Sequence, residues 1–310
     1  MRSLVLFVLS LATAFAASSP FDGRWDITIT GDTARAYWLG LEGAGTPSAK
    51  GTFVSAYNGD LNKIDEISVQ GGTLTFSFRH KDNGKEVHDV FTAHLDGRKL
   101  VGTEAVQGST SPVKHWVGVH APVIADKDDA SWKESKPVRL FNGKDTVGWN
   151  SLTPDKPLGW TVEGGILKSK GGASNLVTAQ KFWNYTLHVE FRLGKGSNSG
   201  LGLRARYEVQ ILDDYGKPAS THGNGALYSR ILPSENASKP AGEWQTYDIR
   251  LVGREVTVVL NGKTIISKGV IEGLTAIAAD ANEGQPGPLI LQGDHGPVEF
   301  RAIVLTPLIK

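Results

Sequence analysis

The stretch GLGLRARYEVQILDD, residues 200–214, decides the fold class of this chain. Apolar and polar side chains alternate along it. The apolar positions are Leu201, Leu203, Ala205, Tyr207, Val209 and Ile211, and the polar positions between them are Arg204, Arg206, Glu208 and Gln210. A period of two is typical of a β-strand with one packed face. The sequence therefore predicts one long strand with an apolar face against a second sheet and a polar face of guanidinium, carboxylate and amide groups.

The rest of the chain has the same character. No stretch longer than about ten residues shows a helical period, so we expect an all-β protein. Glycine accounts for 37 of the 310 residues, which indicates many turns. Asn261-Gly262 between two alternating runs is a strong hairpin signal. About ten or more short strands in residues 138–310 predict a jelly-roll β-sandwich.

Residues 21–121 predict a separate, smaller unit. Short linkers join its strands, which favours hairpins in sequence order and a small up-and-down β-barrel-like domain. The eight expected strands are Arg24–Thr30, Ala34–Leu41, Gly51–Ala56, Lys63–Val69, Thr73–His80, Glu86–Leu95, Lys99–Gln107 and Lys114–His120. Residues 122–137 are polar and charged, and we interpret them as a linker, with Trp132 attaching it to one domain.

Residues 1–17 have the features of a signal peptide: Arg2, an apolar run, and small residues ending at Ala17. Without them the chain carries 32 basic and 32 acidic residues and neither Cys nor Met. Disulfide frameworks, thiolate metal sites and Cys nucleophiles are thereby excluded, and a neutral chain favours no nucleic-acid partner. No later apolar run approaches the about 20 residues of a membrane span. We expect an exported bacterial protein, periplasmic or extracellular.

Three segments carry groups suited to chemistry. In the polar row, Glu208 is a candidate general base, and Arg204 and Arg206 are candidate anion-binding groups. The alternative for each is an ion pair within a solvated row. The segment LQGDHG, residues 291–296, offers Asp294 and His295 as an acid–base pair or half of a metal site.

The third segment is the Gly-rich loop THGNGALY, residues 221–228, which follows the polar strand. His222 and Tyr228 in it are candidate proton donors over the same surface. The alternatives are a solvated histidine here and, at Asp294 and His295, side chains that serve only their own turn.

Several segments together resemble the 3-keto-disaccharide hydrolase domain family. They include LFNGKDTVGW (140–149), WTVEGGILKSKGG (160–172), EFRLGKGSNSGLGLRARYEVQILDD (190–214), VVLNGK (258–263) and PLILQGDHGPVEFRAIVLTPL (288–308). The resemblance covers residues 138–308 and not the N-terminal unit. It implies a concanavalin A-like jelly roll, exported by bacteria that degrade glycans, and a glycoside or oligosaccharide as substrate.

The resemblance also implies a reaction. A ketone at carbon 3 of a sugar acidifies the hydrogen on carbon 2, so that a base can form an enolate and the group on carbon 1 can leave. The implied roles are Glu208 as base and His295 as acid–base group, with both as ligands if a divalent metal serves as the Lewis acid. Arg204 would stabilise the anion. Arg206, Gln210, Gln292, Asp294, His222 and Tyr228 would contact the substrate.

Two other functions stay open. An ordinary jelly-roll glycosidase carries several carboxylates on one strand, but here Gln210 stands between Glu208 and Asp213, and Asp213 has the opposite parity. A carbohydrate-binding module would bind sugar without turnover. Release of an aglycone separates the enzymes from the module.

Overall fold

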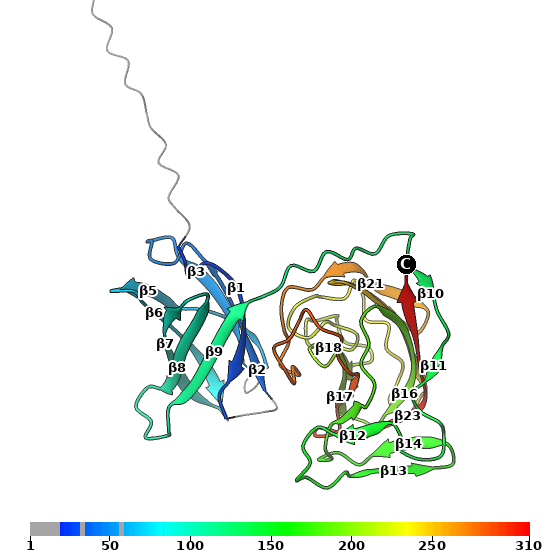
Figure 1. The fold of residues 1–310 in the computed structure, drawn as a ribbon. Helices are drawn as coiled ribbons and strands as arrows, with labels where there is room; N and C mark the ends of the chain where they lie inside the picture. Colours follow the sequence, from blue (N-terminus) through cyan, green and yellow to red (C-terminus); the bar gives the residue numbers. More distant parts are fainter. Residues whose placement is uncertain (1–18, 32–34, 56–58, 83) are drawn as a thin grey trace, which may run out of the picture.

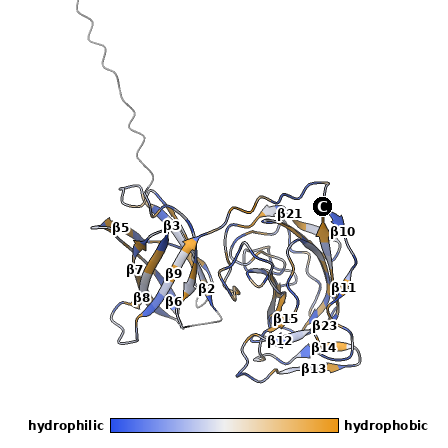
Figure 2. Cartoon of the chain, in the orientation of Figure 1, coloured by the Kyte–Doolittle hydropathy of each residue, from blue (hydrophilic) through white to orange (hydrophobic). Residues whose placement is uncertain are grey.

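The chain folds as two all-β units, shown in Figure 1, in a computed structural model. Residues 19–31, 35–55, 59–82 and 84–310 are described. The segment expected to be a signal peptide, residues 1–17, lies outside them. Within the described residues, no helix is long and apolar enough to cross a membrane. Hydrophobic stretches follow the strands of both units (Figure 2).

The N-terminal unit is one antiparallel sheet of nine strands in the order β4-β3-β2-β1-β9-β8-β7-β6-β5. Its strands are β1 (Gly23–Ile29), β2 (Ala36–Glu42), β3 (Lys50–Val54), β4 (Leu61–Lys63), β5 (Glu66–Gln70), β6 (Thr73–Asp82), β7 (Lys85–Asp96), β8 (Lys99–Val106) and β9 (Lys114–His120). Every neighbour except β1–β9 is consecutive in sequence, so the predicted up-and-down barrel-like fold is confirmed.

The prediction of eight strands is wrong at one place. The expected strand Lys63–Val69 is divided into β4 and β5 by a corner. Ile64 N donates to Gly51 O on the β3 side at 3.0 Å, and Asp65 N donates to Ser77 O on β6 at 2.8 Å. The chain changes sheet partner within two residues, which brings β4 into contact with β6 and curls the sheet toward closure.

Aromatic rings fill the interior of the barrel. Phe76 and Phe91 stack with centroids 4.6 Å apart, and Phe53 lies against both. Tyr37 donates its hydroxyl hydrogen to the buried Glu104 at 2.9 Å. The barrel is therefore built around a packed core and not around a ligand.

The C-terminal unit is an antiparallel jelly-roll sandwich. One sheet has the order β13-β14-β23-β16-β19-β20-β21 with β10 and β11 paired to β23, and the other has the order β12-β15-β22-β17-β18. The strands are β10 (Lys133–Glu134), β11 (Val138–Arg139), β12 (Trp149–Ser151), β13 (Trp160–Glu163), β14 (Ile166–Ser169), β15 (Leu176–Thr178), β16 (Tyr185–Leu193), β17 (Asn198–Leu203), β18 (Tyr207–Leu212), β19 (Gln245–Val252), β20 (Glu255–Leu260), β21 (Lys263–Val270), β22 (Ile290–Leu291) and β23 (Val298–Ile309).

The stretch 200–214 is a hairpin and not the single strand that the alternation predicts. Arg204 and Ala205 have φ of 52° and 58°, and this left-handed backbone reverses the chain between β17 and β18. Glu208 consequently pairs with Gly202, and Gln210 with Gly200. Within β18 the alternation holds, so Glu208 and Gln210 share a face, but Arg204 and Arg206 lie in the turn and do not.

Residues 122–137 run from β9 across the sandwich to β10 and are fastened to it (Figure 1). The Asp126 carboxylate accepts hydrogen bonds from the side chains of Trp183 and Asn184 at 2.8 and 2.9 Å. Asp128 pairs with Arg250 at 2.9 Å. The Trp132 ring lies under the ammonium group of Lys310 at 4.7 Å.

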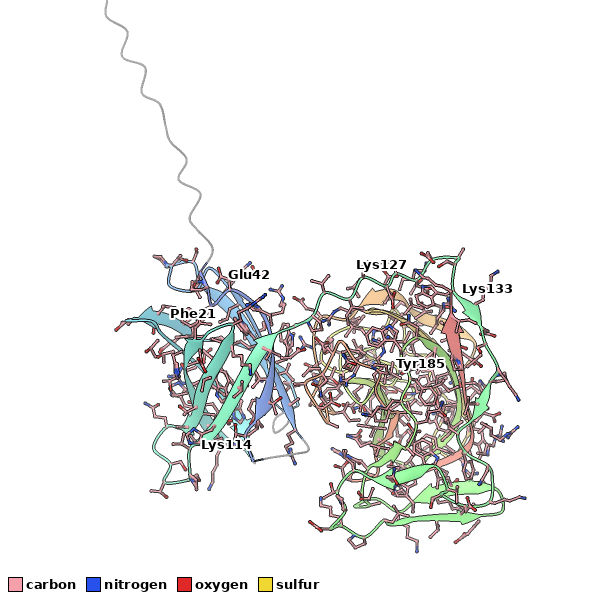
Figure 3. The ribbon with its side chains drawn as sticks, viewed as in Figure 1. Phe21, Glu42, Lys114, Lys127, Lys133 and Tyr185 are labelled. Carbon is pink, nitrogen blue, oxygen red and sulfur yellow. The ribbon has the colours of Figure 1, made fainter. Side chains whose placement is uncertain are left out.

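The two units share one hydrophobic core. Ala36, Trp38 and Val54 on β2 and β3 belong to the same buried cluster as the sandwich interior. Side chains fill the interiors of both units, and Tyr185 lies within the sandwich (Figure 3). The barrel is thus packed on the sandwich as one layer of a core packs on another, so we expect the two units to unfold together.

Gly273 tests this shared core. Its φ is +78°, and a Cβ built there would lie 2.1 Å from Trp38 Nε1. Gly143 has the same φ with nothing within 4 Å, so Gly143→Ala carries the backbone strain alone, about 1–2 kcal/mol. We expect Gly273→Ala to lower the free energy of unfolding by about 2 kcal/mol more than Gly143→Ala does. Both variants should unfold in a single urea transition. Separate transitions for the two units would contradict the shared core.

Candidate functional site

A cavity of about 420 Å³ opens at one end of the five-stranded sheet. Six of the residues predicted from the sequence line it: Glu208, Gln210, Tyr228, Gln292, Asp294 and His295. They come from β18, from the loop after it and from the turn after β22. Residues far apart in sequence therefore meet in one concave, largely polar site.

Glu208 lies on the floor of this cavity and is 4% exposed. Gly200 makes room for it, because a Cβ at Gly200 would lie 2.5 Å from Glu208 Oε1. Among the described residues no group donates a hydrogen bond to its carboxylate. Burial raises the pKa of Glu208 to about 8, with the charge of His295 opposing the rise and that of Asp294 adding to it. A carboxyl group with this pKa can gain and lose a proton near neutral pH.

Asp294 and His295 form the acid–base pair that the sequence suggested. His295 Nδ1 and Asp294 Oδ1 lie 2.7 Å apart, and this hydrogen bond raises the pKa of His295 above its ordinary value. Burial acts to raise the pKa of Asp294, but the hydrogen bonds of His295 and Asn175 lower it below its usual range. The pair therefore favours the imidazolium form of His295 more strongly than a free histidine does.

Two glycines place this pair. A Cβ at Gly293 would lie 2.8 Å from the Trp160 ring, and one at Gly296 would lie 2.4 Å from Ser197 Oγ. The turn can therefore sit tightly against the sandwich while Asp294 and His295 face the cavity. The two glycines beside the pair in the sequence serve this close packing.

Two buried amide oxygens in the cavity wall lack partners among the described residues, namely Gln292 Oε1 and Asn198 Oδ1. Buried polar atoms are nearly always hydrogen-bonded in native proteins. Gln210 differs, since its Oε1 accepts from Ile211 N at 3.0 Å, and it serves the local backbone.

Tyr228 lines another part of the cavity, and His222 packs against Tyr228 from behind. Burial, followed by the charges of Glu208 and Asp60, raises the pKa of Tyr228 to about 12, so its hydroxyl remains a donor. The His222 ring meets the Tyr228 ring edge-on at 4.8 Å. His222 Nε2 lies 2.6 Å from Asp60 Oδ1 of the barrel, so His222 supports the wall and Tyr228 forms it.

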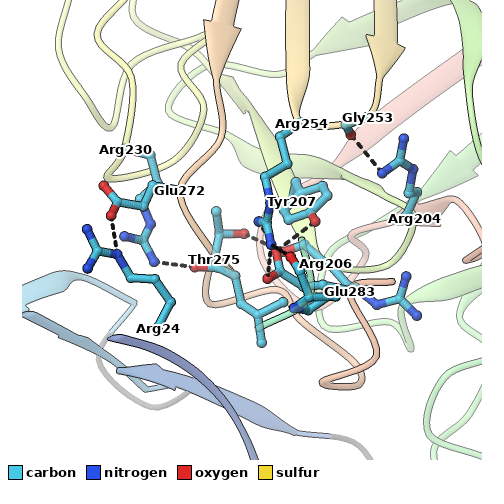
Figure 4. A network of polar contacts seen from close by, with 12 residues as sticks. Arg24, Arg204, Arg206, Tyr207, Arg230, Gly253, Arg254, Glu272, Thr275 and Glu283 are labelled. Carbon is cyan, nitrogen blue, oxygen red and sulfur yellow. Dashed lines mark hydrogen bonds and ion pairs between the residues drawn. The ribbon is translucent and has the colours of Figure 1, made fainter. Parts of the chain in front are cut away.

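The predicted catalytic role of Arg204 does not fit its place in the fold. The side chain is fully buried away from the cavity, and its guanidinium donates to Trp183 O, Gly253 O and Asn184 Oδ1 at 2.6, 2.9 and 3.0 Å. It also stacks on the Trp183 ring at 3.9 Å. Figure 4 shows it pointing to Gly253. Because the chain turns at Arg204, this side chain enters the structural interior and does not continue the row of Glu208.

Arg206 is likewise structural and not a substrate contact. Its Nε and Nη2 donate to Asp280 Oδ1 at 2.8 and 2.7 Å, and its Nη1 donates to Gln285 O at 2.8 Å. These bonds fasten the loop of residues 275–285, part of which forms the cavity wall at Ile277. The alternative stated for the arginines was an ion pair within the row, but Arg206 pairs with Asp280, which lies in another loop.

Sequence reasoning missed ten of the sixteen described lining residues, and four of these ten are polar or come from the barrel in a way that shapes the site. Asn175 fixes the Asp294 turn, since its Oδ1 accepts from Gly293 N at 2.8 Å. Asn198 precedes the glycines of β17, and the polar run Ser197-Asn198-Ser199 before an apolar strand was a usable signal. Arg35 and Gly59 come from the barrel, and nothing local in the sequence shows that they reach the cavity.

The residues present do not build a metal site. Within the described part of the chain, no three His, Asp or Glu side chains come together to hold an ion. Glu208, Asp294 and His295 interact electrostatically, but Asp294 and His295 are already paired to each other. No step below is routed through a metal.

The family model described as a 3-keto-alpha-glucoside-1,2-lyase-like domain matches residues 136–306. A curated 3-keto-disaccharide hydrolase of Bacteroides thetaiotaomicron is 26% identical over 165 residues, which are 42% of this chain and 57% of that protein. The alignment thus spans less than two thirds of that relative.

Two solved structures that are similar to this chain have TM-scores below 0.5. A crystal structure from Parabacteroides distasonis, provisionally described as a glycosyl hydrolase, is 26% identical and has a TM-score of 0.48, covering 65% of this chain and 94% of that chain. The κ-carrageenase of Pseudoalteromonas carrageenovora is 10% identical with a TM-score of 0.37, covering 60% and 97%.

Glu208→Gln tests the burial of this carboxyl. Its folded pKa of about 8 exceeds the ordinary 4.5, so the folded state binds the proton more tightly and stability falls as pH rises between these values. The loss is at most about 5 kcal/mol. We expect the variant to melt at a higher temperature than wild type at pH 9 and at nearly the same temperature at pH 5. The exposed Glu66→Gln is the control, and an equal shift at both pH values would contradict the assignment.

Proposed function

Because this chain belongs to the 3-keto-α-glucoside-1,2-lyase-like domain family, we propose that it cleaves glycosides whose sugar carries a ketone at carbon 3. The observation that carries the proposal is the buried carboxyl of Glu208, without a hydrogen-bond donor of its own, on the floor of a polar cavity beside the Asp294–His295 pair. The site contains one candidate base and one candidate donor, which is what this chemistry needs.

The reaction proceeds through elimination. The Glu208 carboxylate takes the proton from carbon 2, and the electron pair of that C–H bond forms an enolate with the ketone. The enolate then expels the group on carbon 1, which leaves as an alcohol after it receives a proton. A double bond remains between carbons 1 and 2, and addition of water to carbon 1 yields the 3-keto sugar. The net result is hydrolysis without the two opposed carboxylates of ordinary glycosidases.

His295 is the donor in this scheme. Asp294 holds its ring and keeps it protonated to a higher pH, so that its free nitrogen can give a proton to the leaving oxygen or a hydrogen bond to the enolate. Gln292 and Asn198 line the cavity, and their side-chain amides are the candidate contacts to sugar hydroxyls. Arg204 has no part, since its guanidinium is satisfied in the interior.

The two alternative functions have less support. For an ordinary glycosidase, the second acidic residue of the β18 region, Asp213, accepts from Gly196 N at 2.7 Å and stabilises that turn instead of lining the cavity. For a binding module, the cavity lacks an exposed aromatic platform, because Tyr228 is the one aromatic residue among its described lining.

We also propose that the protein is exported by a bacterium, with residues 1–17 removed. The support is the sequence pattern alone. Mass spectrometry of the protein from a periplasmic extract would show an N-terminus near Ser18. An N-terminus at Met1 in the cytoplasmic fraction would overturn this part of the proposal.

The direct test is aglycone release from a chromogenic 3-keto-glucoside and from its unoxidised parent, each with and without EDTA. We expect release from the keto form alone. Glu208→Gln should lower kcat by about 10²–10⁴-fold and His295→Ala by about 10²-fold, while Glu66→Gln leaves it unchanged. Equal cleavage of both substrates would favour an ordinary glycosidase, and binding without release would favour a module.

The pH dependence tests the role of Glu208. A base must be ionised, so kcat/KM should rise with pH through a value near 8. Glu208→Asp should keep a rising limb at lower rate, because it retains a carboxylate, and Glu208→Gln should lose it. A rising limb that persists in Glu208→Gln would contradict the role of Glu208 as the base, whereas a fall at higher pH would report the loss of the proton that His295 donates.

A further inference from the structure

The barrel lies outside the family match at 136–306, yet it reaches the cavity. Arg35, in the connection between β1 and β2, and Gly59, in the connection between β3 and β4, line the same cavity as Glu208. The conclusion drawn from the sequence, that this domain is an accessory of open purpose, therefore leaves out part of the site.

Residues 59–61 of the barrel dock on residues 221–229 of the sandwich. Asp60 Oδ1 lies 2.6 Å from His222 Nε2, and Leu61 N donates to Ser229 Oγ at 2.9 Å. Gly59 has a φ of +76°, and a Cβ there would lie 3.5 Å from the Tyr228 ring and hydroxyl. Asp60 and Leu61 thus contact two different residues of the loop that carries Tyr228, and Gly59 lies beside Tyr228 itself.

The loop depends on these contacts for its shape. Ser229 has a left-handed φ of 57°, which a non-glycine residue adopts only when its surroundings hold it. Its hydroxyl receives the bond from Leu61, and its N–H donates to Thr221 O at 2.8 Å. Tyr228 lies in the loop between His222 and Ser229, which both contact the barrel, and it lines the cavity.

The next residue along is also fixed by the barrel. The Arg230 guanidinium lies over the Trp38 ring at 4.6 Å and donates to Leu274 O at 2.6 Å. Beside it, Arg24 Nε of β1 donates a hydrogen bond to Glu272 Oε1 at 2.5 Å, as Figure 4 shows. Trp38 is part of the shared core, so the barrel is packed rigidly against the sandwich and is not a separate domain on a flexible linker.

We propose that the barrel completes the catalytic pocket, with Asp60 as a positioning residue for Tyr228 and Arg35 as a specificity-determining residue that binds the hydroxyls of a second sugar ring. The proposal rests on the proposed function and assigns part of its substrate site to the barrel. A cavity of about 420 Å³ is in the size range of small-molecule sites that hold more than one ring. The planar fork of an arginine suits a pair of sugar hydroxyls.

The Arg35 test compares two substrates in the full-length protein. With Arg35→Gln we expect KM for a 3-keto-disaccharide to rise about tenfold, with kcat and the KM for a methyl 3-keto-glucoside unchanged. Calorimetric titration of the disaccharide into the Glu208→Gln background should show the same loss without turnover. Equal effects on both substrates, or none, would overturn this role.

The Asp60 test separates positioning from folding. Asp60→Asn should lower kcat about tenfold on both substrates at unchanged melting temperature, and should increase hydrogen exchange in residues 221–229. Asp60→Glu should restore part of kcat. Asp96→Asn, at the exposed end of β7, is the matched control. Kinetics and exchange equal to those of the control would overturn the role of Asp60.

These outcomes are distinct from a failure of the proposed function. If wild type releases no aglycone but binds the disaccharide, and Arg35→Gln weakens that binding, the proposed elimination is wrong. The proposal that the barrel forms part of the binding pocket is then supported. If wild type turns over the 3-keto substrate and neither barrel variant differs from Asp96→Asn, the function stands and the barrel wall fails. If wild type neither binds nor cleaves, both fail.

Discussion

The reversal of the chain at Arg204 and Ala205 is the constraint on which the site depends. Two successive non-glycine residues in the left-handed region are strained, and each costs on the order of 1–3 kcal/mol. Arg204 offsets this by donating three hydrogen bonds into the interior and stacking on Trp183. The turn sets the register of β17 against β18, which pairs Glu208 with Gly202, and the missing side chain of Gly200 leaves room for the Glu208 carboxyl.

The carboxyl of Glu208, the proposed base, lies in a buried position that disfavours its charged form. Burial opposes its ionisation, so the fold gives up stability at neutral and alkaline pH in order to keep a basic carboxylate in the cavity. The neighbouring pair has the opposite electrostatics, because Asp294 and His295 stabilise each other's charged forms. Two environments in one cavity thus separate a base from an acid.

The contact between the units has the chemistry of a core and not of a mobile domain interface. Trp38 fills the space above Gly273, and the buried Asp26 of β1 faces Glu283 of the sandwich. Burial and the charge of Glu283 raise the pKa of Asp26 to about 9, while Arg254 and Tyr207 hold Glu283 by hydrogen bonds of 2.7–2.8 Å. Such an interface favours one fixed arrangement, which suits a barrel that forms part of a binding wall.

The sequence by itself determined the all-β class, the two units and their hairpins, because period-two alternation and turn chemistry are local properties. It also identified Glu208, Asp294, His295 and Tyr228 as lining residues, since each lies on a polar face or a Gly-rich turn beside a strand. Tertiary structure decided the rest. A turn made of arginine and alanine carries no glycine signal, so alternation alone placed Arg204 and Arg206 on the wrong surface. Arg35 and Gly59 reach the cavity, and Asp60 reaches His222, only because two units pack through one core, a contact between residues more than a hundred positions apart.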